Sequence, residues 1–365
     1  MKTMQLVPAL EQGGVERGVV EMNRAIVAAG WENVVVSAGG RLSEDIVRDG
    51  ARHIKSDVKS KNPLTYFARA RALGRIIEEE RPDVICAHSR VPAWLYVWAK
   101  RRCAVPWITF AHGANSISPY SRVMTFGDLT VTPSRYIADY LKAAYGIAEE
   151  KLRVIPRAIE ADRFDAETLD GAFIEEKRNA WRTAGRRVVM GLGRITQLKG
   201  YDTLIRAVAL LPKEYMLVIV GEAEELRKDV EEDLRTLVSD LGIAERVVFA
   251  GNQSKVAESL SIADVVVSSN TKKPEAFGRS MAEALAMDRP VVAKAFGGAL
   301  DIVEPGRNGE LVAEGTAEEF ARAIDIAAKA HYKDLRKAAL EKFSFARMAA
   351  SSLAVYRELA QGTKQ

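Results

Sequence analysis

Strand-length apolar runs alternate with longer amphipathic segments along the whole chain. Apolar runs of this length suit strands buried on both faces of a sheet, and the longer segments have the periodicity of helices. In the first half, the expected strands are residues 4–8, 33–37, 84–88, 107–110, 128–133 and 152–155. The expected helices between them are residues 14–29, 63–80, 91–102 and 134–145.

A second series of the same kind follows a polar, charged stretch with few apolar positions. Its expected strands are residues 188–192, 216–220, 247–250, 264–268, 290–293 and 310–312. Its expected helices are residues 201–211, 223–241, 253–261, 279–287 and 316–329. This alternation predicts the α/β class, with two Rossmann-like domains that each contain a parallel sheet covered on both faces.

The polar stretch sets the expected domain boundaries. Residues 1–160 form an N-terminal Rossmann-like domain, residues 161–187 a linker with a short helix, and residues 188–342 a C-terminal Rossmann-like domain. The amphipathic segment 343–365 follows the last strand, and we expect it to cross back onto the N-terminal domain as a helix.

Composition places the chain among globular proteins and argues against a bound metal. The chain has 365 residues, 48% apolar and 28% charged, without an apolar run long enough to span a bilayer or a signal-like start, so a cytoplasmic location is expected. Cys86 and Cys103 form no CxxC motif, the four histidines are scattered, and no Asp-x-Asp triplet occurs. We therefore expect metal-independent chemistry without a cofactor.

The positive charge is concentrated in the first half. The net charge is +4, and residues 1–156 carry 22 Lys and Arg against 16 Asp and Glu. Such an excess attracts an anionic acceptor or an anionic membrane, whereas basic runs and aromatics do not cluster as nucleic-acid binding requires. Residues 91–102 join aromatic residues to three cations, which fits either membrane contact or a buried helix. The basic residues 48–61 fit either a mobile acceptor loop or a solvated one.

Glycines and cations follow the first expected strand of each half, where parallel sheets bind ligands. Gly13 and Gly14 separate a strand from a helix, which allows either close approach to an anion or merely a tight turn. In residues 191–200, Gly193 is followed by Arg194 and Lys199, a forked donor and a point charge suited to a diphosphate. Solvated surface cations are the alternative.

This loop is not a dinucleotide fingerprint, because Ile195 stands where the third glycine belongs. The chain also lacks a G-x-x-x-x-G-K-[ST] loop. A nicotinamide oxidoreductase and a P-loop NTPase are therefore disfavoured.

Two carboxylates frame the most specific segment, residues 274–292. Glu275 precedes an expected helix, Phe277 and Gly278 lie at its start, and Glu283 lies inside it among apolar residues. A carboxylate accepts two vicinal hydroxyls at once, so these residues suit a sugar and a ribose. His112 precedes a glycine at the end of a strand, where it is either structural or exposed to a ligand.

Together these groups resemble the family 4 glycosyltransferases over nearly the whole chain. The Glu-x7-Glu signature appears as Glu275 and Glu283, and the Gly-Arg-x4-Lys-Gly loop as residues 193–200. Gly13-Gly14 and His112-Gly113 match two further motifs. In residues 290–304, Gly298 matches the diphosphate-side loop, although Asp301 replaces the Glu that is common in the family.

The resemblance implies a GT-B enzyme that binds a nucleotide sugar on its second lobe and a glycan or lipid-linked acceptor on its first. Glu283 would hold the ribose, Glu275 with the amides near Phe277 and Gly278 the donor sugar, and Gly298 the diphosphate side. Arg194 and Lys199 would neutralise the diphosphate, helped by the amides near Gly14, and His112 would contact the donor sugar near its reacting carbon. The donor would be a UDP-, GDP- or ADP-sugar.

The family's reaction retains the anomeric configuration, with the acceptor attacking from the face that the diphosphate leaves. Catalysis then rests on positioning and electrostatics, and loss of Arg194 or Lys199 would lower turnover roughly 10²–10³-fold. The resemblance also implies a role in lipopolysaccharide or other cell-surface glycan synthesis, with the enzyme at the cytoplasmic face of a membrane. The alternatives are a GT-B epimerase, a glycogen-synthase-like polymerase and a non-catalytic nucleotide-sugar-binding scaffold.

Overall fold

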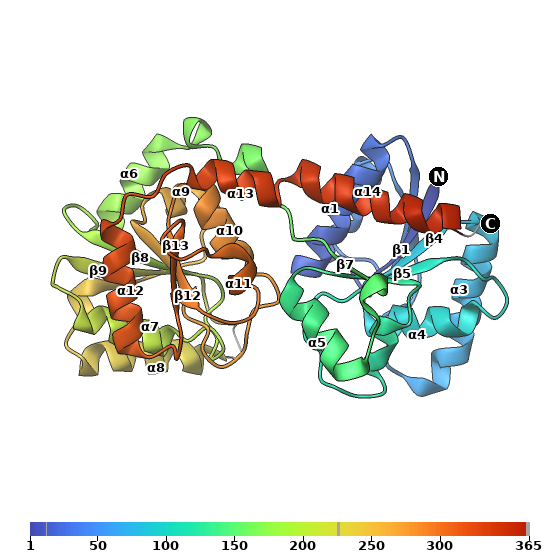
Figure 1. Ribbon diagram of the computed structural model, residues 1–365, viewed down its shortest axis with the longest axis horizontal. Coiled ribbons are helices and arrows are strands. Elements are labelled where there is room, and N and C mark those ends of the chain that lie inside the picture. The colour runs from blue at the N-terminus through green and yellow to red at the C-terminus, as the bar shows by residue number, and fades with distance from the viewer. Residues whose placement is uncertain (12, 225–226, 363–365) are drawn as a thin grey trace. The chain divides into compact units, whose positions relative to one another are not determined.

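The computed structural model describes residues 1–11, 13–224 and 227–362. The chain forms two compact units, one made of Met1–Arg157 with Phe345–Gln365 and the other of Ala158–Ser344. Residues 225 and 226 of the expected helix 223–241, and residues 363–365 of the expected C-terminal helix, lie outside the described residues. Figure 1 shows a sheet with helices on both faces in each unit, which confirms the expected fold class.

The first unit has a parallel sheet in the order β3-β2-β1-β4-β5-β6-β7. Side chains alternate across it, so that Met4 and Leu6 pack toward α3 and α4 while Val35 packs toward α1 and α2. The strands are β1 (Lys2–Leu6), β2 (Glu32–Ser37), β3 (Arg52–Lys55), β4 (Val84–Ala87), β5 (Trp107–Phe110), β6 (Leu129–Thr132) and β7 (Leu152–Val154). The helices are α1 (Gly14–Ala28), α2 (Ser43–Arg48), α3 (Tyr66–Glu80), α4 (Arg90–Ala99), α5 (Arg135–Tyr145) and α14 (Phe345–Gly362).

The last helix of the chain is part of the first unit. Helix α14 packs against α1 and β4, and its Tyr356 is fully buried beside Cys86. Figure 1 shows it running along the same face as α1. Burial raises the pKa of the Cys86 thiol to about 12, so this cysteine stays protonated.

The second unit has a parallel sheet in the order β10-β9-β8-β11-β12-β13. Its strands are β8 (Arg187–Leu192), β9 (Tyr215–Val220), β10 (Val247–Gly251), β11 (Val265–Ser268), β12 (Val291–Lys294) and β13 (Gly309–Val312). Its helices are α6 (Gly171–Ala180), α7 (Tyr201–Leu210), α8 (Lys228–Asp240), α9 (Val256–Ser261), α10 (Arg279–Ala286), α11 (Ala299–Ile302), α12 (Ala317–Lys329) and α13 (Leu335–Phe343).

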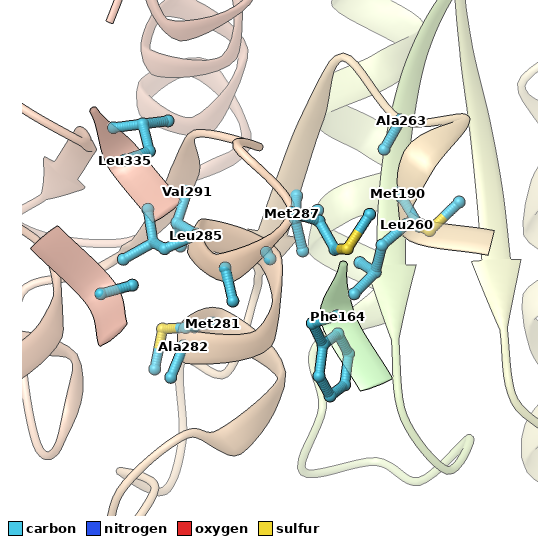
Figure 2. Close-up of a cluster of buried hydrophobic side chains, with 14 of the residues drawn as sticks. Phe164, Met190, Leu260, Ala263, Met281, Ala282, Leu285, Met287, Val291 and Leu335 are labelled. Carbon is cyan, nitrogen blue, oxygen red and sulfur yellow. The ribbon is translucent and has the colours of Figure 1, made fainter. Parts of the chain in front are cut away.

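The segment expected to be a linker lies within the core of the second unit. Phe164 and Trp181 from residues 161–187 are both 4% exposed and join a cluster with side chains of α9 and α10. Figure 2 shows Phe164 on the same side of the sheet as Met190 and Leu260. The polar composition of residues 161–187 gave no sign that Phe164 and Trp181 are buried. Their burial makes this stretch part of the second unit.

Two other parts of the first unit had more than one interpretation in the sequence. The basic stretch 48–61 contains edge strand β3, where His53 Nε2 lies 2.8 Å from Ser37 Oγ, so part of the expected loop is ordered by strand pairing. The aromatic stretch 91–102 forms α4, in which Leu95 and Tyr96 are fully buried, as a buried Rossmann helix requires. Among the described residues, no helix combines the length and the apolar character that crossing a membrane demands.

Candidate functional site

The loop between β8 and α7 carries two of the expected cations. Gly193 and Gly200 have φ angles of 138° and 65°, which L side chains rarely adopt. A Cβ on Gly200 would lie 2.0 Å from the carbonyl oxygen of Ser269, which follows β11. The Ser269 hydroxyl also donates to the Lys199 carbonyl over 2.8 Å. These contacts fix the backbone of Lys199 against the end of a neighbouring strand.

The Lys199 ammonium donates to the Glu275 carboxylate, which comes from the loop before α10. Both side chains are partly exposed, 24% for Lys199 and 19% for Glu275, so a ligand can reach them. Gly278 begins α10 with a φ of 104°, and a Cβ there would lie 3.2 Å from the second oxygen of Glu275. The missing side chain leaves room for the carboxylate at the helix start.

A third loop closes this corner of the second unit. The Gly298 amide donates to the Glu275 carbonyl over 2.9 Å, and a Cβ on Gly298 would lie 2.2 Å from the Phe277 carbonyl oxygen. Phe277 itself is buried in the core. The structure therefore brings together five of the expected donor-site residues, namely Lys199, Glu275, Phe277, Gly278 and Gly298.

Arg194 and Glu283 lie at the margins of this corner. The Arg194 guanidinium is 73% exposed and pairs with Glu224, a residue that follows β9. Glu283 is half-buried within α10, next to buried Ala282 and Ala284. The corner thus offers one ion pair, Lys199 with Glu275. Arg194, in the loop after β8, adds a second cation, and Glu283, in α10, adds a second carboxylate.

In the first unit, the expected glycines begin α1. Gly13 caps the helix and Gly14 is its first residue, with no other atom near its missing side chain. A Cβ on Gly13 would lie 2.2 Å from a carboxylate oxygen of Glu16, so an anionic group already lies at the positive end of this helix. The start of α1 therefore has the geometry and polarity that an anion requires.

His112 belongs to a hydrogen-bonded chain of four side chains. Its Nε2 lies 3.1 Å from His88 Nδ1, and its Nδ1 lies 2.7 Å from Arg157 Nη2. The other nitrogen of His88 lies 2.9 Å from the amide oxygen of Gln5. Arg157 can only donate and the Gln5 oxygen can only accept, so both histidines are neutral with the proton on Nε2. Neither ring nitrogen of His112 is left for a ligand or a proton transfer.

The surroundings hold both rings in this neutral state. Burial and the Arg157 charge lower the pKa of His88 to about 3. Burial, Arg157 and His88, in that order, lower the pKa of His112 well below its ordinary value. The rings are also parallel, at an interplanar angle of 8° and a centroid distance of 5.3 Å. The chain fixes the orientation of His112, and with it the backbone of the His112-Gly113 turn.

Sequence reasoning missed three members of this chain, Gln5, His88 and Arg157. Gln5 lies on β1, His88 directly follows β4 and Arg157 comes three residues after β7, so only the sheet order brings them together. One signal was visible, since Gly18 lies inside a helix where glycine is unfavourable. A Cβ there would lie 2.1 Å from Arg157 Nη1, which shows why this position is a glycine.

The second unit holds a cation and a carboxylate in the loops beyond the carboxyl ends of its strands. Two Rossmann-like units with such a site are typical of enzymes that act on nucleotide-linked substrates. The sequence matches the glycosyl transferases group 1 over residues 173–342 and glycosyltransferase family 4 over residues 12–163. The lipopolysaccharide core biosynthesis glycosyltransferase LpsE of Rhizobium meliloti is 30% identical over 320 residues, covering 86% of this chain and 85% of the relative. The chain belongs to the glycosyltransferase family 4, group 1 enzymes.

Solved structures show the same fold. A glycosyltransferase from Rickettsia africae is 26% identical, covers 98% of both chains and has a TM-score of 0.90. Anabaena Alr3699/HepE in complex with UDP is 21% identical, covers 98% of this chain and all of its own, and has a TM-score of 0.86. Both likenesses support the GT-B fold expected from the sequence.

Proposed function

We propose that this glycosyltransferase moves a sugar from a nucleoside diphosphate sugar to a glycan or lipid-linked acceptor, with retention and without a metal ion. The Lys199–Glu275 pair in its glycine-packed corner carries the proposal. The ammonium would neutralise the departing diphosphate, and the carboxylate would hold the donor sugar's hydroxyls. Arg194 would add a second positive charge, and Glu283 would accept the ribose hydroxyls.

The amides and glycines of the two units would serve the phosphates. The start of α1 at Gly13 and Gly14 would offer backbone N–H groups and a positive helix end once the Glu16 carboxylate moves aside. In the second unit, Gly193 packs beside the end of the Lys199 side chain and Gly298 against the Phe277 carbonyl, and the main-chain groups of these two loops would bind the diphosphate.

The proposed step needs no nucleophile from the protein. The bond from the anomeric carbon to the diphosphate oxygen breaks while the acceptor oxygen bonds to that carbon from the same face. The acceptor's proton passes to the departing phosphate oxygen. The engaged nitrogens of His112 support this scheme, because they offer no free base beside the sugar. His112 would act through its backbone and its fixed ring, and catalysis would rest on positioning and charge.

Lipopolysaccharide or another cell-surface glycan is the proposed destination of the sugar. The relative from Rhizobium meliloti, which this chain matches over most of both lengths, carries lipopolysaccharide core biosynthesis in its name. A basic first half suits an acceptor that carries phosphates or other acids.

The test begins with donor binding. UDP-, GDP- and ADP-sugars are screened by thermal shift with a chelator present, and the best donor is repeated with Lys199→Ala and Glu283→Ala. A ligand at a hundredfold excess over its dissociation constant stabilises the folded state by about 2.7 kcal/mol. A shift seen with one nucleotide and lost in both variants supports the donor site, and no shift from any donor would sink it.

Turnover and stereochemistry come next. Nucleoside diphosphate release and the NMR coupling of the product's anomeric proton are followed with the best donor. An inverted product contradicts retention, and activity restored only by a divalent ion contradicts metal independence. Isomerised donor formed without an acceptor identifies an epimerase, and binding without release identifies a scaffold.

A further inference from the structure

A pocket of about 440 Å³ lies at the start of α3 and α4 in the first unit. Three of its side chains are joined by hydrogen bonds and ring contacts. Tyr66 donates to the Trp94 carbonyl over 2.7 Å, and Trp94 Nε1 donates to the Tyr120 carbonyl over 2.9 Å. Among the residues that the structure describes, no carboxylate lines the pocket. Its lining residues are Ser60, Lys61, Asn62, Pro63, Tyr66, Phe67, Arg69, Val91, Trp94 and Tyr120.

Two large apolar side chains project at the rim of this pocket. Leu64 is 90% exposed and Phe67 is 62% exposed. The turn that presents Leu64 is rigidly held, because the buried Arg69 donates to the Ser60 carbonyl over 2.7 Å, the Asn62 carbonyl over 2.9 Å and the Thr65 hydroxyl over 3.0 Å. This turn keeps Leu64 exposed three residues before the exposed Phe67, and a pair of such side chains is a candidate contact surface.

Four cations lie close to these two apolar residues in the chain. Lys59, Lys61, Arg71 and Arg75 are exposed and pair with no carboxylate in the described part of the chain. Arg71 and Arg75 lie four and eight residues after Phe67, on nearly the same face of α3. Asp57 faces Arg69 at 3.9 Å, and the exposed Glu78 and Glu79 follow Arg75 at the end of α3. Exposed apolar side chains on the same segment as unpaired cations fit the interface of an anionic membrane.

The pocket is also adjacent in the chain to the His112 region. Val91 follows His88 by three residues, and Tyr120 ends the loop that begins at His112. Arg90 lies between the two, with its guanidinium 5.3 Å from the Tyr120 ring centroid and donating to Ser121 Oγ over 3.1 Å. These residues all follow the carboxyl ends of β4 and β5, the edge where the first unit would receive its acceptor.

We infer that this pocket is a lipid site through which the enzyme works on an anionic membrane surface. Leu64 and Phe67 enter the surface, the aromatic pocket takes hydrocarbon of one anionic lipid, and the lipid phosphate lies on Lys61 and Arg90. The identification of that lipid as the acceptor rests on the proposed function. Under this assignment the acceptor is lipid-linked and is glycosylated while it remains in the membrane.

The first experiment measures vesicle binding by flotation, without a donor. Vesicles of phosphatidylcholine with added phosphatidylglycerol are compared with pure phosphatidylcholine. The full chain should bind the anionic vesicles, less tightly at high salt, and the double variant Leu64→Ser with Phe67→Ser should bind at least about tenfold more weakly. Leu300→Ser with Ile326→Ser is the matched control, because these residues are 56% and 55% exposed in the second unit. An equal effect of the two double variants, or no binding of the full chain, overturns the proposal.

The second experiment asks whether hydrocarbon enters the pocket. Anionic lipids brominated along the acyl chain should quench the fluorescence of Trp94, which lines the pocket. The quenching should fall about twofold in Trp94→Phe and stay unchanged in Trp181→Phe, whose indole lies in the second core. Equal quenching in both variants would show surface adsorption without an occupied pocket, and the lipid site would fail.

These results separate this inference from the proposed function. Vesicle binding with no sugar transfer to any acceptor contradicts the transferase proposal and leaves the lipid site standing. Transfer to a water-soluble acceptor at the same kcat/KM in Leu64→Ser with Phe67→Ser, together with no vesicle binding, contradicts the lipid site and leaves the transferase standing.

Discussion

The two units hold their candidate site residues by different means. In the second unit, loops after β8, β11 and β12 are pressed together by glycines, and one ion pair, Lys199 with Glu275, joins two of them. In the first unit, side chains from β1 and from the segments after β4, β5 and β7 form one hydrogen-bonded chain that ends at Arg157. The first arrangement is fixed by backbone shape and the second by side-chain chemistry.

This difference determines how each region should respond to mutation. A backbone-packed corner should lose function but little stability when both charges of its ion pair are removed. It should lose stability when a glycine gains a side chain. A buried hydrogen-bonded chain couples its members, so that a change at one position alters the protonation of another. The two regions therefore call for different experiments.

The largest effect is expected from Lys199→Met. Loss of the ammonium should lower turnover roughly 10²–10³-fold, the usual scale for a removed electrostatic contact. The double variant Lys199→Met with Glu275→Gln removes the ion pair without leaving a half-buried charge alone. It should recover thermal stability and remain inactive, as steady-state kinetics and calorimetry would show. Recovery of turnover in the double variant would mean that the pair is structural only.

Glu224→Gln is the matched control for charge. It removes the carboxylate that pairs with exposed Arg194 and leaves the cation itself in place. Turnover should stay within about twofold of wild type, because the Arg194 cation remains and an exposed ion pair positions it only weakly. A loss as large as that of Lys199→Met would show that the Arg194–Glu224 pair itself takes part in the reaction.

The next effect concerns the glycines of the second unit. Gly200→Ala places an L side chain in the left-handed region, which lowers the free energy of unfolding by about 1–2 kcal/mol. Its Cβ would also lie 2.0 Å from the Ser269 oxygen, and such overpacking lowers the stability by about 1–3 kcal/mol more. Gly306→Ala is the control, since its φ of 74° carries the same strain in open space. Chemical denaturation should show the larger loss for Gly200→Ala, and equal losses would contradict the packing argument.

The sequence was informative about the second unit for the same reason. Strand-length apolar runs predicted all of its strands, and glycines beside cations and carboxylates marked the corner, because a backbone-packed loop must show its glycines in the sequence. In the first unit the edge strand β3 was missed, since its residues are polar and only half-buried. Gln5, His88 and Arg157 were missed because no local pattern connects residues so far apart in the chain.

The histidine chain predicts a pH dependence of stability. His88 has a pKa of about 3 in the folded protein and an ordinary value near 6.5 when unfolded, so the unfolded state binds more protons between these values. The contribution of neutral His88 to the free energy of unfolding is complete above about pH 7. It decreases as the pH falls, by about 2 kcal/mol at pH 5. Denaturation of wild type and His88→Gln at both pH values measures this difference. The same pH slope in both proteins would show that His88 is not kept neutral.

The smallest perturbation tests whether Arg157 sets the state of His112. Gly18→Ala places a Cβ 2.1 Å from Arg157 Nη1, which displaces the flexible end of that side chain. Alanine also favours the helix by up to about 1 kcal/mol, so stability should not fall. The pKa of His112 should rise toward its ordinary value, because Arg157 both donates to its Nδ1 and repels its charged form.

Histidine NMR titration of Gly18→Ala should therefore show the His112 resonance moving at a higher pH than in wild type. Gly74→Ala in α3 is the control, since its nearest neighbour would be 3.9 Å away and the titration should not change. If His112 stays neutral throughout in Gly18→Ala, burial alone keeps it neutral and Arg157 is not its partner in function. If His112 titrates in Gly18→Ala and kcat/KM falls as His112 gains a proton, the reaction requires neutral His112. The glycine motifs of the first unit would then not be sufficient for its function.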